Sequence, residues 1–238
     1  MRVLDRQRPP RWGDLRLRLV SAAVLAPLAL AAIWWGGALF DGLMAGAAVG
    51  LAIEWVGLCR TCPAWRLRAA AGVGWIVLAM GSALWLRADP LVGRANLGFL
   101  VVAVWGSDVG AYLAGRLIGG PKLAPAISPG KTWSGAVGGL VGAAAIGIVI
   151  AATHGMRHAD MHAMGLARAA AVGAAISMLG QAGDLAESWA KRCFGVKDSG
   201  RLIPGHGGLL DRLDAALAVL PAAALLAYHL GPGLVLWQ

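Results

Sequence analysis

Long apolar runs separated by short polar connections dominate the chain. About seven of these runs reach the roughly 17–25 residues that a helix needs to cross a bilayer. In hydrocarbon every backbone amide must be satisfied within its own segment, so we expect the Leu- and Ala-rich runs to be helices. The predicted spans are residues 18–36, 38–58, 69–86, 95–115, 133–152, 168–186 and 210–231. The pattern predicts an all-α, polytopic helical membrane protein.

Two polar connections are rich in Gly and Pro, and neither suits a regular helix. They cover residues 119–130 and 199–208. No linker or internal repeat is visible between the apolar runs. We therefore expect a basic N-terminal arm, residues 1–18, followed by a single membrane-embedded domain, residues 19–238.

The composition supports a membrane protein. Hydrophobic residues make up 58% of the chain and charged residues only 14%, whereas a soluble domain carries about 25% charged residues. The 35 glycines suit helices that pack closely within a bilayer. We expect no cleaved signal peptide, since the first apolar run is followed at once by a second one.

The cations are distributed unevenly along the chain. A cytoplasmic N-terminus and seven spans place nearly all of the 21 Lys and Arg residues on the cytoplasmic side. The exceptions are Arg87, Arg94, Arg157 and Arg168. This asymmetry accounts for the net charge of +9, so we expect no nucleic-acid partner. It also predicts that segments 116–131 and 191–210 are both cytoplasmic and that the C-terminus is outside.

Acidic residues occur in two pairs near the predicted cytoplasmic surface. Asp184 and Glu187 share one helix face, as do Asp211 and Asp214. A charged residue at a helix centre costs about 2.5–3.5 kcal/mol to insert, so such residues usually have a task. We expect Asp184, Asp211 and Asp214 to bind Mg²⁺ or another divalent cation.

The alternative to metal binding is local pairing of the same acids. Asp214 would then pair with Arg212 or with a backbone donor. For Glu187, a salt bridge with Lys191 is the favoured interpretation.

A cluster of cations and glycines surrounds these acids. Cations beside flexible backbone suit phosphate oxygens. We predict that Lys191 and Lys197 are exposed cations with catalytic roles, together with Asp184 and Asp211. His206 is expected to contact phosphate rather than act as a base. The predicted phosphate-binding residues in this cluster are Arg192, Gly205, His206, Gly207, Gly208 and Arg212.

A second polar region lies between residues 105 and 135. Asp108 lies deep enough in a predicted span to need a partner, or it helps to shape a nucleotide pocket. Ser128 is predicted to cap the next helix, with Pro129 in its first turn. Lys131 and Thr132 would then lie at the amide end of that helix, a ready anion site. The alternative is a capped helix with a snorkelling lysine.

These motifs closely resemble those of the phosphatidate cytidylyltransferases, the CDP-diacylglycerol synthases. The resemblance is strongest over residues 188–214. It is supported by the W-x-x-D-x-x-A-Y-x-x-G pattern at 105–115, the S-P-x-K-T pattern at 128–132 and the G-D-L-x-E-S pattern at 183–188. Ser134 and Ala190 depart from the family pattern, but neither removes an obvious ligand.

The resemblance implies an enzyme that joins CTP to phosphatidic acid and releases pyrophosphate. The expected partners are both substrates, a divalent cation and the bilayer, with a homodimer left open. The expected location is the bacterial inner membrane, with the active site facing the cytoplasm. Three alternatives remain: CTP transfer to another lipid phosphate of the isoprenoid-ether type, an ion channel or transporter, and an inactive homologue.

Overall fold

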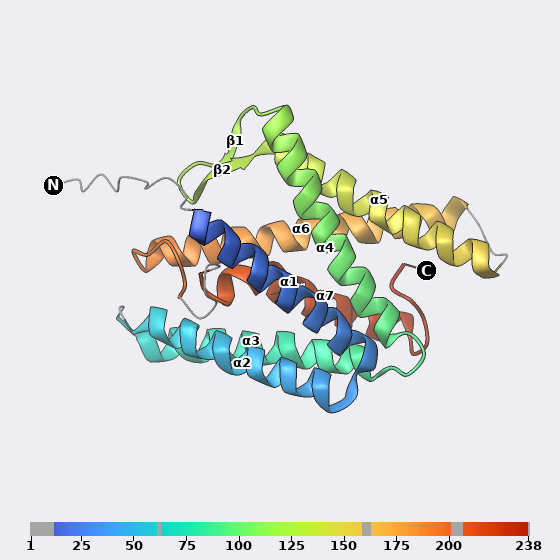
Figure 1. The fold of residues 1–238 in the computed structure, drawn as a ribbon, viewed down its shortest axis with the longest axis horizontal. Helices are drawn as coiled ribbons and strands as arrows, with labels where there is room; N and C mark the ends of the chain where they lie inside the picture. Colours follow the sequence, from blue (N-terminus) through green and yellow to red (C-terminus); the bar gives the residue numbers. More distant parts are fainter. Residues whose placement is uncertain (1–11, 61–62, 159–162, 201–206, 238) are drawn as a thin grey trace.

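The computed structural model describes residues 12–60, 63–158, 163–200 and 207–237, with side chains from residue 23 onward except at 155–158. The described residues form seven helices and one two-stranded hairpin (Figure 1). The helices are α1 Trp12–Trp35, α2 Gly37–Cys59, α3 Trp65–Ala88, α4 Gly93–Leu117, α5 Trp133–His158, α6 Ala163–Cys193 and α7 Leu210–Leu230.

The helices confirm the predicted polytopic membrane protein. Helices α2 to α7 are each long and apolar enough to cross a bilayer, while the part of α1 with described side chains is the shorter apolar stretch Ala23–Trp35. Helix α1 begins at Trp12, inside the predicted arm. Helix α6 continues to Cys193, well beyond the predicted end of its span, so the polar run through Lys191 is helical.

Glycines allow α4, α5 and α6 to pack with their backbones almost in contact. A Cβ atom at Gly138 of α5 would lie 2.5 Å from the carbonyl oxygen of Gly110 on α4. Similarly, a Cβ at Gly173 of α6 would lie 2.9 Å from the carbonyl carbon of Ala143 on α5. Such small-residue contacts are how helices approach closely where lipid supplies no hydrophobic drive.

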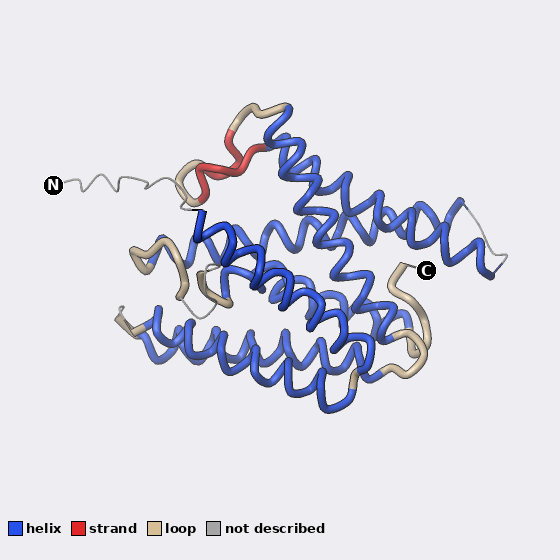
Figure 2. The backbone as a smooth tube through the Cα atoms, in the orientation of Figure 1, coloured by secondary structure: helices blue, strands red, loops and turns tan. Residues whose placement is uncertain are grey.

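The connection between α4 and α5 is a β-hairpin rather than a helix start. Strands β1 Lys122–Ala124 and β2 Ser128–Thr132 pair antiparallel (Figure 2). The predicted Ser128 cap with Pro129 in the first helical turn is therefore wrong, because α5 begins at Trp133. Ser128 precedes a proline, which favours extended backbone. Thr132 takes the capping role instead, as its Oγ1 accepts from the Gly135 amide at 3.1 Å.

The polar segments gather at one end of the helix bundle. The start of α1, the end of α2, the start of α3, the hairpin and the described residues that follow α6 and precede α7 all lie on the left in Figure 1. The α1–α2 and α3–α4 connections and the C-terminal segment lie at the opposite end. We call these the hairpin end and the C-terminal end of the molecule.

Candidate active site

Three carboxylates meet where α6 and α7 approach each other at the hairpin end. Asp184 and Glu187 come from α6 and Asp214 from α7, and one oxygen from each lies within 4.8 Å of the others. Gly183 allows this approach, because a Cβ there would lie 2.7 Å from the carbonyl oxygen of Asp214. We call Asp184, Glu187 and Asp214 the carboxylate cluster.

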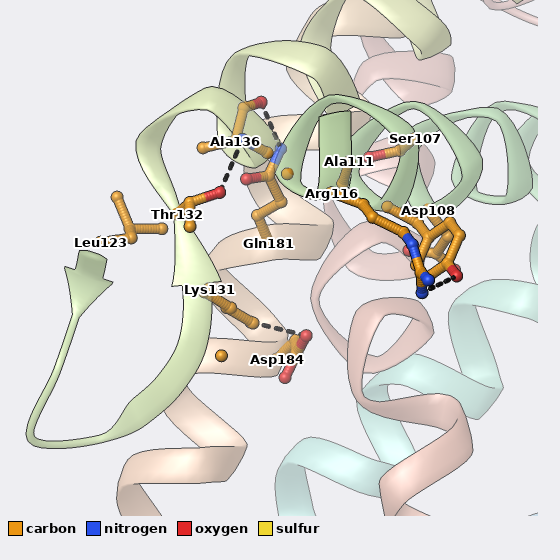
Figure 3. A pocket seen from close by; sticks show the side chains of 14 residues that line it. Ser107, Asp108, Ala111, Arg116, Leu123, Lys131, Thr132, Ala136, Gln181 and Asp184 are labelled. Atoms are coloured by element: carbon orange, nitrogen blue, oxygen red, sulfur yellow. Dashed lines mark hydrogen bonds and ion pairs between the residues drawn. The ribbon is translucent and has the colours of Figure 1, made fainter. Parts of the chain in front are cut away.

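The hairpin brings a lysine to this cluster. Lys131 Nζ on β2 lies 2.6 Å from Asp184 Oδ2 (Figure 3). The lysine side chain is 25% exposed and that of Asp184 is 40% exposed. Lys131 and Thr132 directly precede α5, so they lie at its amide end as expected, and anion binding there stays a prediction. The snorkelling lysine does not describe this arrangement, since Lys131 projects from a strand towards an acid on another element.

Lys191 is enclosed between two acids. Its Nζ lies 2.7 Å from Glu187 Oε2 and 2.6 Å from Asp211 Oδ1. All three side chains are at most 14% exposed. The expected Glu187–Lys191 salt bridge is therefore confirmed, whereas the expectation that Lys191 is exposed is wrong. The second oxygen of Glu187, Oε1, is buried and has no hydrogen-bond partner among the described residues.

Asp211 and Asp214, the two acids of α7, differ in the hydrogen-bond donors that their oxygens receive. Asp211 Oδ1 accepts from Lys191, and its Oδ2 accepts from the Ser199 amide at 3.2 Å and the Gly208 amide at 3.0 Å. The donor described for Asp214 is local, the Ala215 amide at 2.8 Å on Oδ1. The structure thus groups Glu187, rather than Asp211, with Asp184 and Asp214.

Two adjoining cavities open beside the carboxylate cluster. The first, of about 420 Å³, lies between α4, the hairpin, α5 and α6 (Figure 3). The second, of about 360 Å³, lies between α4, α6 and α7 and includes Asp211, Arg212 and Asp214 in its lining. Asp108 and Asp184 line both cavities. Each volume falls in the range of small-ligand pockets.

A polar ladder inside the helices supports the wall between the cavities. Gln181 Nε2 donates to the Ala136 carbonyl at 3.1 Å and to Ser177 Oγ at 2.9 Å. Ser177 Oγ in turn lies 2.7 Å from Ser107 Oγ. Our prediction from the sequence missed Gln181, although a glutamine one helical turn before Asp184 in an apolar span is the kind of signal that could have found it.

The remaining predicted phosphate-binding residues are spread around this end. Thr132 lines the first cavity, but Ser128 is not part of either lining. Arg192 joins the hairpin to the last turn of α6, since its Nε donates to the Ile127 carbonyl at 3.3 Å. Lys197 is exposed, as expected.

The glycine loop is described only in part. Gly205 and His206 lie outside the described residues. Gly207 has the positive φ of 85° that favours glycine. Gly208 is buried and its amide already donates to Asp211. Its role in the structure is therefore to hold Asp211.

Comparison with known proteins gives one consistent family. The model of the cytidylyltransferase family matches residues 64–230. The phosphatidate cytidylyltransferase of Brucella suis biovar 1 (strain 1330) is 43% identical over 189 residues, which is 79% of this chain and 63% of the relative. That of Rickettsia bellii (strain RML369-C) is 32% identical over 211 residues, 88% of this chain and 89% of the relative. The chain thus spans less than two thirds of the Brucella relative. It belongs to the cytidylyltransferase family.

Proposed function

We propose that this protein transfers a cytidylyl group from CTP to phosphatidic acid, giving CDP-diacylglycerol and pyrophosphate. The observation that carries the proposal is the carboxylate cluster, with Lys131 and Lys191 beside it, at the junction of two cavities. Relatives named phosphatidate cytidylyltransferase support the choice of reaction. The channel or transporter alternative gains no support from the family match.

A divalent cation fits the residues present. The cluster supplies hard carboxylate oxygens, the ligands that Mg²⁺ prefers. Glu187 Oε1 is buried and unpartnered among the described residues, as expected of a ligand that awaits a cation. We propose that Asp184, Glu187 and Asp214 hold the ion, with Asp211 supporting them through Lys191. A bound Mg²⁺ would neutralise charge on the phosphate oxygens.

The protein's own part in the reaction is to align two anionic substrates and balance their charge. An oxygen of the phosphatidate monoester attacks the α-phosphorus of CTP, and the bond to the β-phosphate oxygen breaks as pyrophosphate leaves. The monoester is already ionised near neutral pH, so no side-chain base is needed. Lys131 lies at the cavity wall, where its ammonium would offset phosphate charge. Arg212, which lines the second cavity, is placed to do the same.

The membrane setting fits a lipid substrate. Both cavities lie between helices that are apolar enough to span a bilayer, so the acyl chains of phosphatidic acid can stay in the lipid while the headgroup reaches the acids. We propose that the hairpin end faces the cytoplasm of the bacterial cell, where CTP is available, and that the protein lies in the inner membrane. A homodimer remains a prediction, to be checked by the mass of the purified protein in detergent.

The decisive test is conversion of radiolabelled CTP by the purified full-length protein. The lipid arms are dioleoyl phosphatidate, an isoprenoid-ether phosphate and no lipid, each with Mg²⁺ or with excess chelator. We expect labelled CDP-diacylglycerol only with phosphatidate and Mg²⁺. Product from the isoprenoid-ether lipid alone would change the substrate, and no product in any arm would contradict the proposed function.

A further inference from the structure

A buried glutamate on α2, Glu54, contacts Ser199 and the start of α7, although it lies far in the sequence from residues 188–214, where the family resemblance is strongest. Glu54 is only 6% exposed. Its described partners are neutral donors that come from the other end of the chain. Leu209 N donates to Oε1 at 2.9 Å, Leu210 N donates to Oε2 at 2.9 Å, and Ser199 Oγ donates to Oε2 at 3.2 Å.

Two of these donors are the amides of Leu209, the capping residue of α7, and of Leu210, its first residue. A helix start leaves several amides without partners inside the helix, and a carboxylate there also suits the helix dipole. The capping residue of α7, Leu209, has no side-chain oxygen to satisfy them. Glu54 therefore caps α7 from another helix.

Glu54 and Asp211 both bind residues at the two ends of segment 199–208. Glu54 joins Ser199 to Leu209 and Leu210 through the serine hydroxyl and the two helix amides. Asp211 joins Ser199 to Gly208 through their amides. Together the two carboxylates hold the two ends of segment 199–208 side by side.

Close backbone approach explains two of the glycines in this region. A Cβ atom at Gly200 would lie 2.5 Å from Glu54 Oε1, and one at Gly208 would lie 2.8 Å from Glu54 Oε2. Any larger residue would have to displace the carboxylate or the segment. Glycine is therefore needed at positions 200 and 208 so that the backbone can lie against the Glu54 carboxylate.

The neighbouring residue strengthens the same attachment. Trp55 stacks edge-on against Phe194, with ring centroids 5.7 Å apart. Its Nε1 donates to the Arg68 carbonyl at 3.0 Å, which fixes the indole against the start of α3. Residues 54 and 55 of α2 thus hold the α6–α7 connection near its beginning and at its end.

We propose that Glu54 is a positioning residue for the proposed reaction. It seats Ser199 and the start of α7, so that Asp211 lies where it can hold Lys191, and Lys191 in turn holds Glu187 in the carboxylate cluster. Glu54 itself lines neither of the two cavities beside the cluster. The expected effects on CTP turnover and Mg²⁺ dependence rest on the proposed function. The expected effect on the structure of segment 199–208 does not.

The test compares Glu54→Gln with Asp41→Asn in the full-length protein. Asp41 is an exposed carboxylate near the other end of the same helix and serves as the matched control. Glutamine offers one acceptor and places an NH₂ group against amide donors. We expect kcat/KM for CTP to fall about 10–100-fold, as for other groups that support metal ligands, and the Mg²⁺ concentration for half-maximal rate to rise. Asp41→Asn should match the wild type.

Limited trypsin cleavage after Lys197 gives a readout that does not depend on activity. Lys197 is exposed and precedes the clamped segment. Cleavage should be faster in Glu54→Gln than in the wild type or in Asp41→Asn. Ser199→Ala removes only one hydroxyl contact and should shift both readouts in the same direction, more weakly. It replaces Glu54→Gln as the deciding variant if that protein fails to fold.

Wild-type Mg²⁺ dependence and wild-type trypsin cleavage in the folded variant would overturn the inference. Reduced thermal stability with unchanged KM and Mg²⁺ dependence would do so as well, because it would mean that Glu54 only stabilises the fold. If the wild type made no CDP-diacylglycerol, the proposed function would fail, while the trypsin comparison would still decide whether Glu54 holds the segment.

Discussion

At the residue scale, Lys191 determines whether the buried acids of the site are tolerated. It balances Glu187 and Asp211, and all three side chains are largely removed from solvent. Removing one partner of a buried ion pair leaves an uncompensated charge, which usually destabilises a protein by about 3–5 kcal/mol. Lys131 differs, because its partner Asp184 is 40% exposed, and pairs that reach solvent contribute only about 0–1 kcal/mol.

Lys191→Met should therefore lower the unfolding free energy by about 3–5 kcal/mol, while Lys131→Met should change it by about 1 kcal/mol or less. Thermal unfolding in one detergent measures both variants. Lys197→Met removes an exposed cation and is the control. Equal stability of the Lys191 and Lys197 variants would show that Lys191 does not compensate buried acids.

Asp184→Asn and Asp214→Asn should each reduce turnover about 100-fold or more, since each removes a carboxylate that would hold the divalent cation beside the reacting phosphates. Both proteins should remain folded in the membrane, because neither acid depends on the Lys191 pair. CTP conversion across a Mg²⁺ titration is the measurement. Full activity in either variant, or in excess chelator, would remove the proposed cation site.

At the element scale, the β1–β2 hairpin connects α4 to α5 and also delivers Lys131 to the cluster. Its last residue, Thr132, caps α5, whereas Ser128 at its first paired position does not. Removal of the Thr132 hydroxyl and removal of the Ser128 hydroxyl should therefore change the stability by different amounts, although both residues belong to the same short motif.

Thr132→Ala should reduce the unfolding free energy by about 0.5–2 kcal/mol, the usual effect of losing a helix cap. Ser128→Ala should leave it within about 0.5 kcal/mol of the wild type. Chemical denaturation of the two purified variants separates these outcomes. A larger loss for Ser128→Ala would instead favour the helix start that we predicted from the sequence.

At the scale of the whole molecule, the C-terminal segment folds back over the end opposite the site. Leu236 N donates to Asn96 Oδ1 at 2.9 Å, and Gly233 N donates to Asp89 Oδ2 at 2.9 Å. Trp237 packs on Phe99, with ring centroids 5.0 Å apart. The amide of Gly233, followed by those of Val92 and Leu91, lowers the pKa of Asp89, although partial burial opposes this.

This lowered pKa predicts a pH dependence of the C-terminal attachment. An acid with a lowered folded-state pKa stabilises the fold fully above its unfolded pKa of about 3.9, and this contribution is lost as pH falls through the folded pKa. The hydrogen-exchange protection factors of residues 231–237, which correct for the intrinsic pH dependence of amide exchange, should therefore be constant above about pH 5 and fall in acid. Asp89→Asn should show faster exchange at neutral pH, and an unchanged rate would contradict the attachment.

The orientation of the whole molecule is tested with single cysteines in a cysteine-free background. Lys122→Cys lies in the exposed hairpin strand and Leu91→Cys is exposed at the C-terminal end. With the hairpin end in the cytoplasm, an impermeant thiol reagent applied to intact cells should label position 91 but not 122. The reverse pattern would place the proposed active site outside.

The sequence by itself determined the helical spans and the region that carries the chemistry. In hydrocarbon a single long segment can satisfy its backbone hydrogen bonds only as a helix. The composition and length of the apolar runs therefore suffice to predict the spans. Charged residues cost too much in such spans to occur without a role, so Asp184, Glu187, Asp211 and Asp214 were visible in the sequence. The positive-inside pattern then placed both Gly- and Pro-rich connections at one end, and the fold has their described residues there.

Only the tertiary structure decided how these residues are paired. The partner of Asp184 is a lysine on a hairpin strand, and the cap of α7 is Glu54 on α2. Such contacts depend on where helices cross and how closely glycines let them approach, and no periodicity along a single helix contains that information. For the same reason Asp211 was predicted as a metal ligand, whereas its oxygens are occupied by Lys191 and two backbone amides in the folded protein.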